Sequence, residues 1–323
     1  MKAFEYVRAT TARSALPHLS PRREDGIHVK GAGIDLLDLA KERVIEPRRL
    51  VSLDATDLEF LDVDRDAWRI GAAVTLAQLA EHDAVRADLP ALAAAALEAA
   101  TPQVRNRATI AGNLCQRPRC WYFRNAVFAD CAKRGGRTCY ALDGENAYHA
   151  IFDVRPCPIV HPSNLAPALL ALGARAQVLG PAGPRTIPLE EFFVRDLARE
   201  HVLAPDEILT SIEVPAPAGR NVYGEVRAKQ SFDFPLVSAA ASARVVGGRL
   251  HDLAVWLGAV APTPRRATEA EAVAGGQAIT PELAAKAARA AFAPATPLAK
   301  NAYKVEVGQA LLTDLLVRLG GER

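Results

Sequence analysis

The chain has 323 residues, half of them hydrophobic, which is enough to bury at least one large core in two or three domains or subdomains. A net charge of +2, from 39 basic and 37 acidic residues, gives no electrostatic reason to expect nucleic acid or an acidic membrane as the main partner. The sequence contains neither an apolar run of the roughly 20 residues that span a bilayer nor a secretory signal. We therefore expect a cytoplasmic protein, or a periplasmic one if a folded complex is exported on a partner's signal.

Residues 1–53 have the pattern of a small β-α-β unit, with an expected strand at 26–30 and an expected helix at 36–40. The turn between them contains two glycines and comprises Lys30, Gly31, Ala32, Gly33, Ile34, Asp35 and Leu36. Glycine at such a turn lets backbone amides approach a phosphate, and the helix dipole adds to the attraction. The spacing is not that of the GxGxxG motif, so an ordinary tight turn is the simpler explanation from the residues alone.

A second glycine turn follows in residues 54–217. The elements expected there are a strand at 68–73, helices at 74–81, 91–100 and 165–172, and strands at 176–179 and 209–214. In the turn, Thr109, Gly112 and Asn113 offer backbone amides and polar side chains to a ligand, although a plain loop explains them equally well. Ser163 or Asn164 is expected to cap the helix at 165–172.

All five cysteines lie in residues 115–157, whose lack of periodicity predicts a long irregular loop. Basic residues lie among them and favour thiolates, including Arg117, Arg119, Arg124, Lys133, Arg134 and Arg137. Structural zinc usually needs a CxxC pair, which is absent, and an odd cysteine count argues against disulfides. Inert buried thiols and an iron–sulfur cluster also stay open, because the spacing matches no simple ferredoxin run. His161 is a further possible ligand, although a histidine before proline is more often a surface or packing residue.

The last hundred residues have a different organisation. Pro215, Pro217 and Gly219 indicate a linker. Beyond it we expect strands at 224–230, 238–246 and 250–260 and helices at 281–292 and 303–319. Because strands and helices are segregated, the helices should cover one face of a sheet. The sequence has no HExxH motif and no nucleophile elbow, so any enzyme chemistry must come from a cofactor.

Six segments carry a family resemblance. They are residues 30–36 (KGAGIDL), 109–113 (TIAGN), 161–169 (HPSNLAPAL), 236–240 (LVSAA), 258–265 (GAVAPTPR) and 301–304 (NAYK). In this order they resemble segments of the FAD-binding middle subunit of molybdenum hydroxylases, the family of xanthine dehydrogenase and aldehyde oxidoreductase. The first two resemble the family's pyrophosphate loops, GGTDL and ATIGGN.

The resemblance implies an α+β fold with two domains. A vanillyl-alcohol-oxidase (PCMH) type FAD-binding domain would occupy 1–217, in subdomains at about 1–53 and 54–217. A smaller α+β C-terminal domain of the CO dehydrogenase flavoprotein type would occupy 220–323, with the flavin between the domains.

By position, the resemblance also implies the residues that bind FAD. They would be Lys30, Gly31, Ala32, Gly33, Ile34, Asp35, Leu36, Thr109, Gly112, Asn113, Ser163, Asn164, Ile208 and Lys229. Ile34 stands where the family has Thr and Asn164 where it has Asp, so the main chain should contribute more than side chains. Lys229, on the expected strand at 224–230, is equally well explained as a solvated charge.

The cysteine loop resembles an insertion that holds a 4Fe-4S cluster in the flavin subunits of bacterial three-subunit aldehyde oxidoreductase. The ligands so implied are Cys120, Cys131, Cys139 and Cys157, and Cys115 is not one of them. The basic residues nearby would offset the cluster's negative charge and raise its potential. Alternatively, the cluster could serve chiefly to hold the loop in place.

The implied function is electron transfer in a heterotrimer. A large molybdenum-cofactor subunit would oxidise an aldehyde, a small subunit with 2Fe-2S clusters would pass the electrons on, and FAD in this chain would deliver them to an external acceptor. The alternative is a metal-binding scaffold subunit of the same type of complex, without redox-active flavin.

Overall fold

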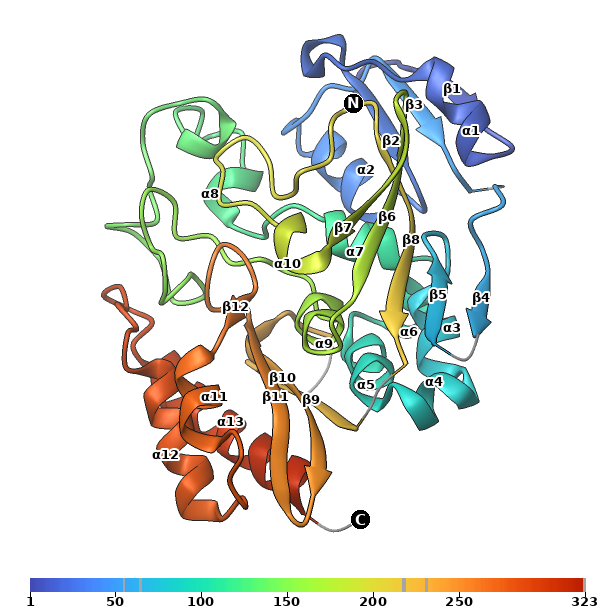
Figure 1. Cartoon of the computed structure of the whole chain (residues 1–323). Helices are drawn as coiled ribbons and strands as arrows, with labels where there is room; N and C mark the ends of the chain where they lie inside the picture. The colour runs from blue at the N-terminus through green and yellow to red at the C-terminus, as the bar shows by residue number, and fades with distance from the viewer. Residues whose placement is uncertain (55, 64–65, 217–218, 230–231, 322–323) are drawn as a thin grey trace.

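The computed structural model describes residues 1–54, 56–63, 66–216, 219–229 and 232–321. Three sheets occupy successive parts of the chain, with helices between and outside them (Figure 1). This mixture of segregated sheets and helices confirms the expected α+β fold class. Every helix in the described ranges is too short or too polar to cross a membrane.

The N-terminal sheet contains the expected β-α-β unit and one further strand. Its elements are β1 (Glu5–Arg8), α1 (Ala12–Ala15), η1 (Leu16–His18), η2 (Arg23–Asp25), β2 (Ile27–Lys30), α2 (Ile34–Lys41) and β3 (Arg49–Ser52). The strands are parallel, with β3 between β1 and β2. Gly33 precedes α2 with a φ of +81°, a left-handed conformation that favours glycine. The backbone therefore requires the glycine at this turn.

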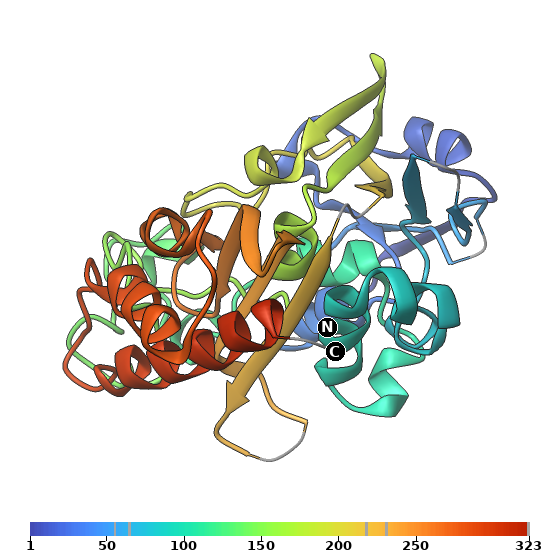
Figure 2. The same cartoon turned by 60° about the horizontal axis from the view of Figure 1, so that its bottom comes forward.

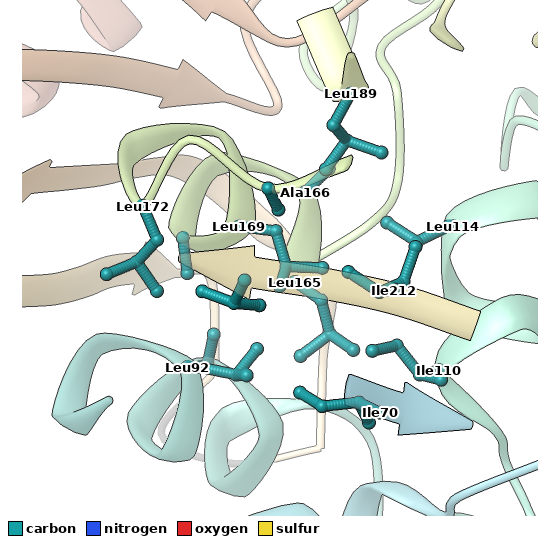
Figure 3. Close-up of a cluster of buried hydrophobic side chains, with 14 of the residues drawn as sticks. Ile70, Leu92, Ile110, Leu114, Leu165, Ala166, Leu169, Leu172, Leu189 and Ile212 are labelled. Atoms are coloured by element: carbon teal, nitrogen blue, oxygen red, sulfur yellow. The ribbon is translucent and has the colours of Figure 1, made fainter. Parts of the chain in front are cut away.

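The middle sheet is antiparallel, in the order β4-β5-β8-β6-β7. Its strands are β4 (Leu61–Val63), β5 (Ala67–Gly71), β6 (Arg175–Gly180), β7 (Gly183–Pro188) and β8 (Ile208–Pro215). Nearby helices are α3 (Leu76–Glu81), α4 (Asp83–Asp88), α5 (Pro90–Glu98), α6 (Pro102–Arg105), α7 (Ile110–Cys115), α9 (Leu165–Ala171) and α10 (Leu189–Phe192). Figure 3 shows the core between them, where Leu92, Leu165 and Leu169 lie close to Ile70 and Ile212 of the sheet. The hairpin β6-β7 projects from the body in Figure 2.

The C-terminal sheet is antiparallel, in the order β12-β11-β10-β9. Its elements are β9 (Arg220–Arg227), β10 (Pro235–Val246), β11 (Arg249–Gly258), β12 (Arg265–Arg266), α11 (Thr268–Ala274), α12 (Pro281–Phe292) and α13 (Tyr303–Gly320). Side chains alternate along β10: Val237, Ala239 and Ala241 belong to the core under the C-terminal helices, whereas Ala240 belongs to the middle core. Helices therefore cover one face, as expected, and α5 and α9 of the preceding region contact the sheet from the other side.

Several element predictions need correction. Strand β7 and helices α4, α10 and α11 were not expected. Strand β9 ends at Arg227, so Lys229 lies in an exposed bend beyond it and not on a strand. Of the expected linker, Pro215 ends β8 and Pro217 lies outside the described residues.

The cysteine loop, residues 115–157, is mostly irregular, as predicted, but it contains helix α8 (Trp121–Arg124) and one 3-10 turn, η3 (Ala132–Arg134). Near its start, Arg124 forms ion pairs with Asp35 (2.6 Å) and Asp38 (2.7 Å) of α2. Figure 1 shows the loop, in green, running from the region of α2 to the C-terminal helices.

The later part of the loop is held by residues 300–304, which we call the C-terminal clasp. Asn301 Nδ2 donates to the carbonyls of His149 (3.1 Å) and Ala150 (3.0 Å). Lys304 Nζ donates to the carbonyls of Tyr148 (3.1 Å) and Ala259 (3.0 Å). Long-range contacts at both ends, and not internal secondary structure, therefore fix the path of this loop.

Candidate functional site

The two glycine turns come together at one large cleft of about 820 Å³. Thr109 Oγ1 accepts the backbone amide of Gly112 (3.1 Å) and so caps α7. A Cβ atom on Gly31 would lie 3.4 Å from this oxygen, and one on Gly112 would lie 3.1 Å from it. The small residues thus keep space open where turns from two different sheets meet.

The first turn presents backbone donors to this cleft. No side chain caps α2, so the amides of its first turn, which have no partner within the helix, are available to a ligand. The helix dipole favours an anion at this end. Ile34, at the same place, is 44% exposed and has no polar group to contribute. The ammonium of Lys30 is held by Asp54 (2.6 Å) and by the carbonyl of Gly31 (2.8 Å).

Asp35 lines the cleft, but its carboxylate already has partners in the cysteine loop. It accepts the backbone amide of Arg117 at 2.8 Å and pairs with Arg119 at 3.0 Å and Arg124 at 2.6 Å. Its observed contacts therefore connect the first glycine turn to the cysteine loop.

A polar network supports the cleft behind the second turn. Ser163 Oγ donates to Asn113 Oδ1 (2.6 Å) and accepts the amide of Ala166 (3.0 Å), so Ser163 caps α9 and lies behind the cleft wall. Asn164 lines the cleft and donates from Nδ2 to Glu225 Oε2 (2.8 Å). Burial raises the pKa of Glu225. An amide at position 164 thus avoids a second carboxylate beside this buried acid.

Of the remaining residues expected to bind FAD, three line the cleft and one does not. Ile208, at the start of β8, lines the cleft, as do Ala32 and Leu36. Lys229 is exposed and does not line it.

The segment 198–207 forms a further wall and was not expected from the sequence. It contributes Glu200 and His201, both largely buried in the cleft lining. Burial lowers the pKa of His201 to about 4, so its ring is neutral at pH 7. The segment has no period and no glycine turn, and only its pair of acid and histidine could have drawn attention.

The cleft fits a dinucleotide-sized cofactor. Its volume is typical of cofactor sites, and its first glycine turn supplies main-chain donors at the N-terminus of α2. These features match the expectation that the main chain contributes most of the polar contacts to a diphosphate.

Four cysteines line a second, smaller pocket: Cys120, Cys131, Cys139 and Cys157. Aromatic and aliphatic groups complete it, including Phe123 and Ile159. Cys115 lies apart from them, at the end of α7 in the lining of the large cleft, and burial raises its pKa to about 12. All five cysteines are free thiols.

Hydrogen-bond donors surround the sulfurs of this pocket. Backbone amides of residues 122 and 123 donate to Cys120, and those of residues 141 and 142 donate to Cys139. His149 Nε2 lies 3.3 Å from Cys120 Sγ. Burial raises the pKa of Cys120 to about 11, whereas a hydrogen bond from Cys157 lowers the pKa of Cys139 to about 7. Hydrogen bonds to sulfur are typical of iron–sulfur sites.

The donor set fits a polynuclear cluster. Among the residues that the structure describes, no three His, Cys, Asp or Glu side chains converge as they would around one metal ion. The four thiols line one pocket, and four cysteines are the usual ligand set of a four-iron cluster. His161 does not line this pocket: it is buried, and its ring packs edge-on against Phe193.

Of the six basic residues named in the sequence analysis, only Lys133 lines the cysteine pocket. Arg117 and Arg119 line the large cleft instead. The expectation that all six surround the cysteines is therefore wrong, because the loop folds back towards α2 and directs several arginines to the acids there.

Family comparisons cover almost the whole chain. Residues 2–217 match the family described as the FAD binding domain in molybdopterin dehydrogenase. Residues 222–319 match the CO dehydrogenase flavoprotein C-terminal domain.

Individual relatives are similar over their full length. The aldehyde oxidoreductase FAD-binding subunit PaoB of Escherichia coli is 37% identical, over 98% of this chain and 98% of its own. The carbon monoxide dehydrogenase medium chain of Hydrogenophaga pseudoflava is 28% identical, over 91% and 88%.

Solved structures have the same fold over almost the whole chain. A chain of the H. pseudoflava carbon monoxide dehydrogenase superposes with a TM-score of 0.77 at 26% identity, covering 98% of this chain and 97% of its own. Quinoline 2-oxidoreductase from Pseudomonas putida 86 reaches 0.78 at 21% identity, covering 99% and 98%, and shows the same fold. The relatives are oxidoreductase or dehydrogenase subunits, which confirms the expected class of protein.

Proposed function

Because this chain belongs to the family of FAD binding domains in molybdopterin dehydrogenases, we propose that it is the FAD and iron–sulfur electron-transfer subunit of a molybdenum-cofactor aldehyde oxidoreductase. Its partners in this proposal are a large molybdenum-cofactor subunit and a small subunit with 2Fe-2S clusters. FAD supplies a group that exchanges electrons singly or in pairs, and an external acceptor takes them away.

One observation carries the proposal: the four cysteines that the resemblance implies as ligands line a single pocket in the same chain as a cofactor-sized cleft. The full-length similarity to an aldehyde oxidoreductase FAD-binding subunit supports the choice of complex. The aldehyde substrate would be selected by the large subunit.

In this proposal each part of the chain has a separate task. The amides of residues 31–36 hold the diphosphate, the small residues of the turn at 109–113 leave room for it, and Asn113 and Asn164 hold polar groups of the cofactor. Cys120, Cys131, Cys139 and Cys157 hold a 4Fe-4S cluster. We assign residues 1–217 to the FAD-binding domain and 220–323 to the domain that closes the cleft region from the other side.

The test is an absorption spectrum of the complex, co-expressed with its partners and purified without oxygen, with flavin and iron counted per chain. We expect flavin bands, broad iron–sulfur absorption and about four irons beyond those of the partners. Flavin without the extra iron would overturn the cluster and keep the flavin subunit. A complex with neither would leave the scaffold function.

A further inference from the structure

A buried ion cluster lies between the two candidate cofactor sites. Glu200 Oε1 is 2.7 Å from Lys133 Nζ, and Glu200 Oε2 is 3.1 Å from Arg117 Nε. The side chains of Lys133 and Glu200 are only 1% and 5% exposed. We call these three residues the ion triad.

The ion triad belongs to both sites at once. Lys133 lines the cysteine pocket, whereas Glu200 and Arg117 line the large cleft. The guanidinium of Arg117 also lies 4.6 Å from the ring centre of Phe123, a residue of the cysteine pocket. The triad therefore forms part of the wall that the two sites share.

The ion triad carries a net positive charge. Burial acts to raise the pKa of Glu200, but the charges of Arg117 and Lys133 outweigh it, so the pKa is lowered and the carboxylate stays ionised. The nearby rings of His161 and His201 are neutral, because burial lowers the pKa of each to about 4. One carboxylate thus faces two cations, and one of these, Lys133, lines the cysteine pocket. Two further contacts fix Lys133 there, to the carbonyls of Asp196 (3.1 Å) and Leu197 (3.3 Å).

We propose that Lys133, held by Glu200, is a positioning residue that sets the reduction potential of the cluster in the cysteine pocket and links it electrostatically to the flavin cleft. The inference rests on the proposed function. A cluster held by four thiolates is negatively charged and becomes more so on reduction, so a fixed buried cation stabilises the reduced form and raises the potential. The negative charge of Glu200 has the opposite effect and lowers the reduction potential of the groups in both sites.

The experiment is a redox titration of the purified complex, followed by electron paramagnetic resonance for the cluster and by absorption for the flavin. Lys133→Met should shift the cluster's reduction equilibrium about tenfold towards the oxidised form, which is about 59 mV for a one-electron couple. The flavin should move less, because Lys133 does not line its cleft. Glu200→Gln removes a negative charge and should move the midpoints of cluster and flavin to higher potential. If Lys133→Met does not bind a cluster, this second variant still tests the inference.

Two control variants separate charge from packing. Lys133→Arg keeps the charge and should retain most of the original potential. Arg137→Met removes an equal charge from an exposed position in the same loop and should leave the potential unchanged.

If the wild-type complex carries the cluster and neither Lys133→Met nor Glu200→Gln changes its potential, this inference is overturned and the proposed function stands. The same holds if Lys133→Arg shifts the potential as far as Lys133→Met. A wild-type complex without the four additional irons would overturn the cluster and the inference together.

Discussion

The large cleft and the cysteine pocket are built in different ways. The cleft is formed largely by turns that leave the ends of regular elements, and its donors are mostly main-chain groups. The cysteine pocket is formed by side chains on an irregular loop that contacts α2 at one end and the C-terminal clasp at the other. We infer that local backbone conformation defines the first site, and long-range contacts define the second.

Among variants that would separate the two sites, the largest effect is expected for Cys131→Ser. Losing one of four thiolate ligands should remove the four irons of the cluster, and the loop should become sensitive to proteolysis, since ligation also holds it in place. Cys115→Ser changes a cysteine of the same stretch that lies outside the pocket. It should keep all four irons. Equal iron contents in the two variants would contradict the assignment of Cys131.

The second prediction concerns the clasp and pH. Burial lowers the pKa of Lys304 from 10.5 to about 7. Between these values the folded chain holds a neutral amine, whose two hydrogens match its two carbonyl acceptors, while the unfolded chain binds a proton. The cost of burying this amine is therefore greatest below pH 7 and is relieved as pH rises towards 10.5, by about 1.4 kcal/mol per unit.

Thermal midpoints from pH 7 to 10 check this pH dependence. The wild-type complex should gain stability relative to Lys304→Met across this range. Parallel curves for the two proteins would show that the buried amine does not titrate there.

The third prediction tests the cleft alone. Asn164→Asp would place a carboxylate against buried Glu225, at a cost of about 2 kcal/mol, and should lower the flavin content. Iron content should not change. Adding Glu225→Gln supplies an amide opposite the new acid and should restore the flavin. A double variant as poor in flavin as Asn164→Asp would mean that repulsion at this pair is not the cause.

The smallest effect is expected for Gly33→Ala. Alanine in the left-handed region costs about 1–2 kcal/mol, and its methyl group would also press on Leu37 and Lys30 at 3.1 Å. Flavin occupancy should fall while iron stays constant. Gly135→Ala is a matched control, because Gly135 has a φ of +90° but lies in the cysteine loop with open space around it. That variant should leave flavin occupancy unchanged, and a flavin loss equal to that of Gly33→Ala would break the distinction between the two regions.

The same difference explains what could be predicted from the sequence. The turn at Gly33 depends on local rules, so its place could be inferred directly, whereas the cap that Thr109 forms on α7 was not predicted. The cysteine loop could be recognised only by its residue type and by resemblance. Its contacts with Asp35 and Asn301 join parts of the chain far apart in sequence, and no periodic pattern encodes such pairs.

Contacts between distant parts of the chain also explain a feature that was not predicted. Glu200 and Lys133 lie 67 positions apart in the numbering yet form one ion pair, which the sequence alone does not reveal. The expected strand at 224–230 included Lys229, whereas β9 ends at Arg227.

The position of the C-terminal clasp also sets an order of events during synthesis. The cysteines at 120–157 leave the ribosome well before residues 300–304, which lie near the end of the chain. The loop therefore stays unclasped until α13 has been made and has docked against the last sheet. Insertion of the proposed cluster would thus have a window, which opens with translation of the loop and closes with docking of α13.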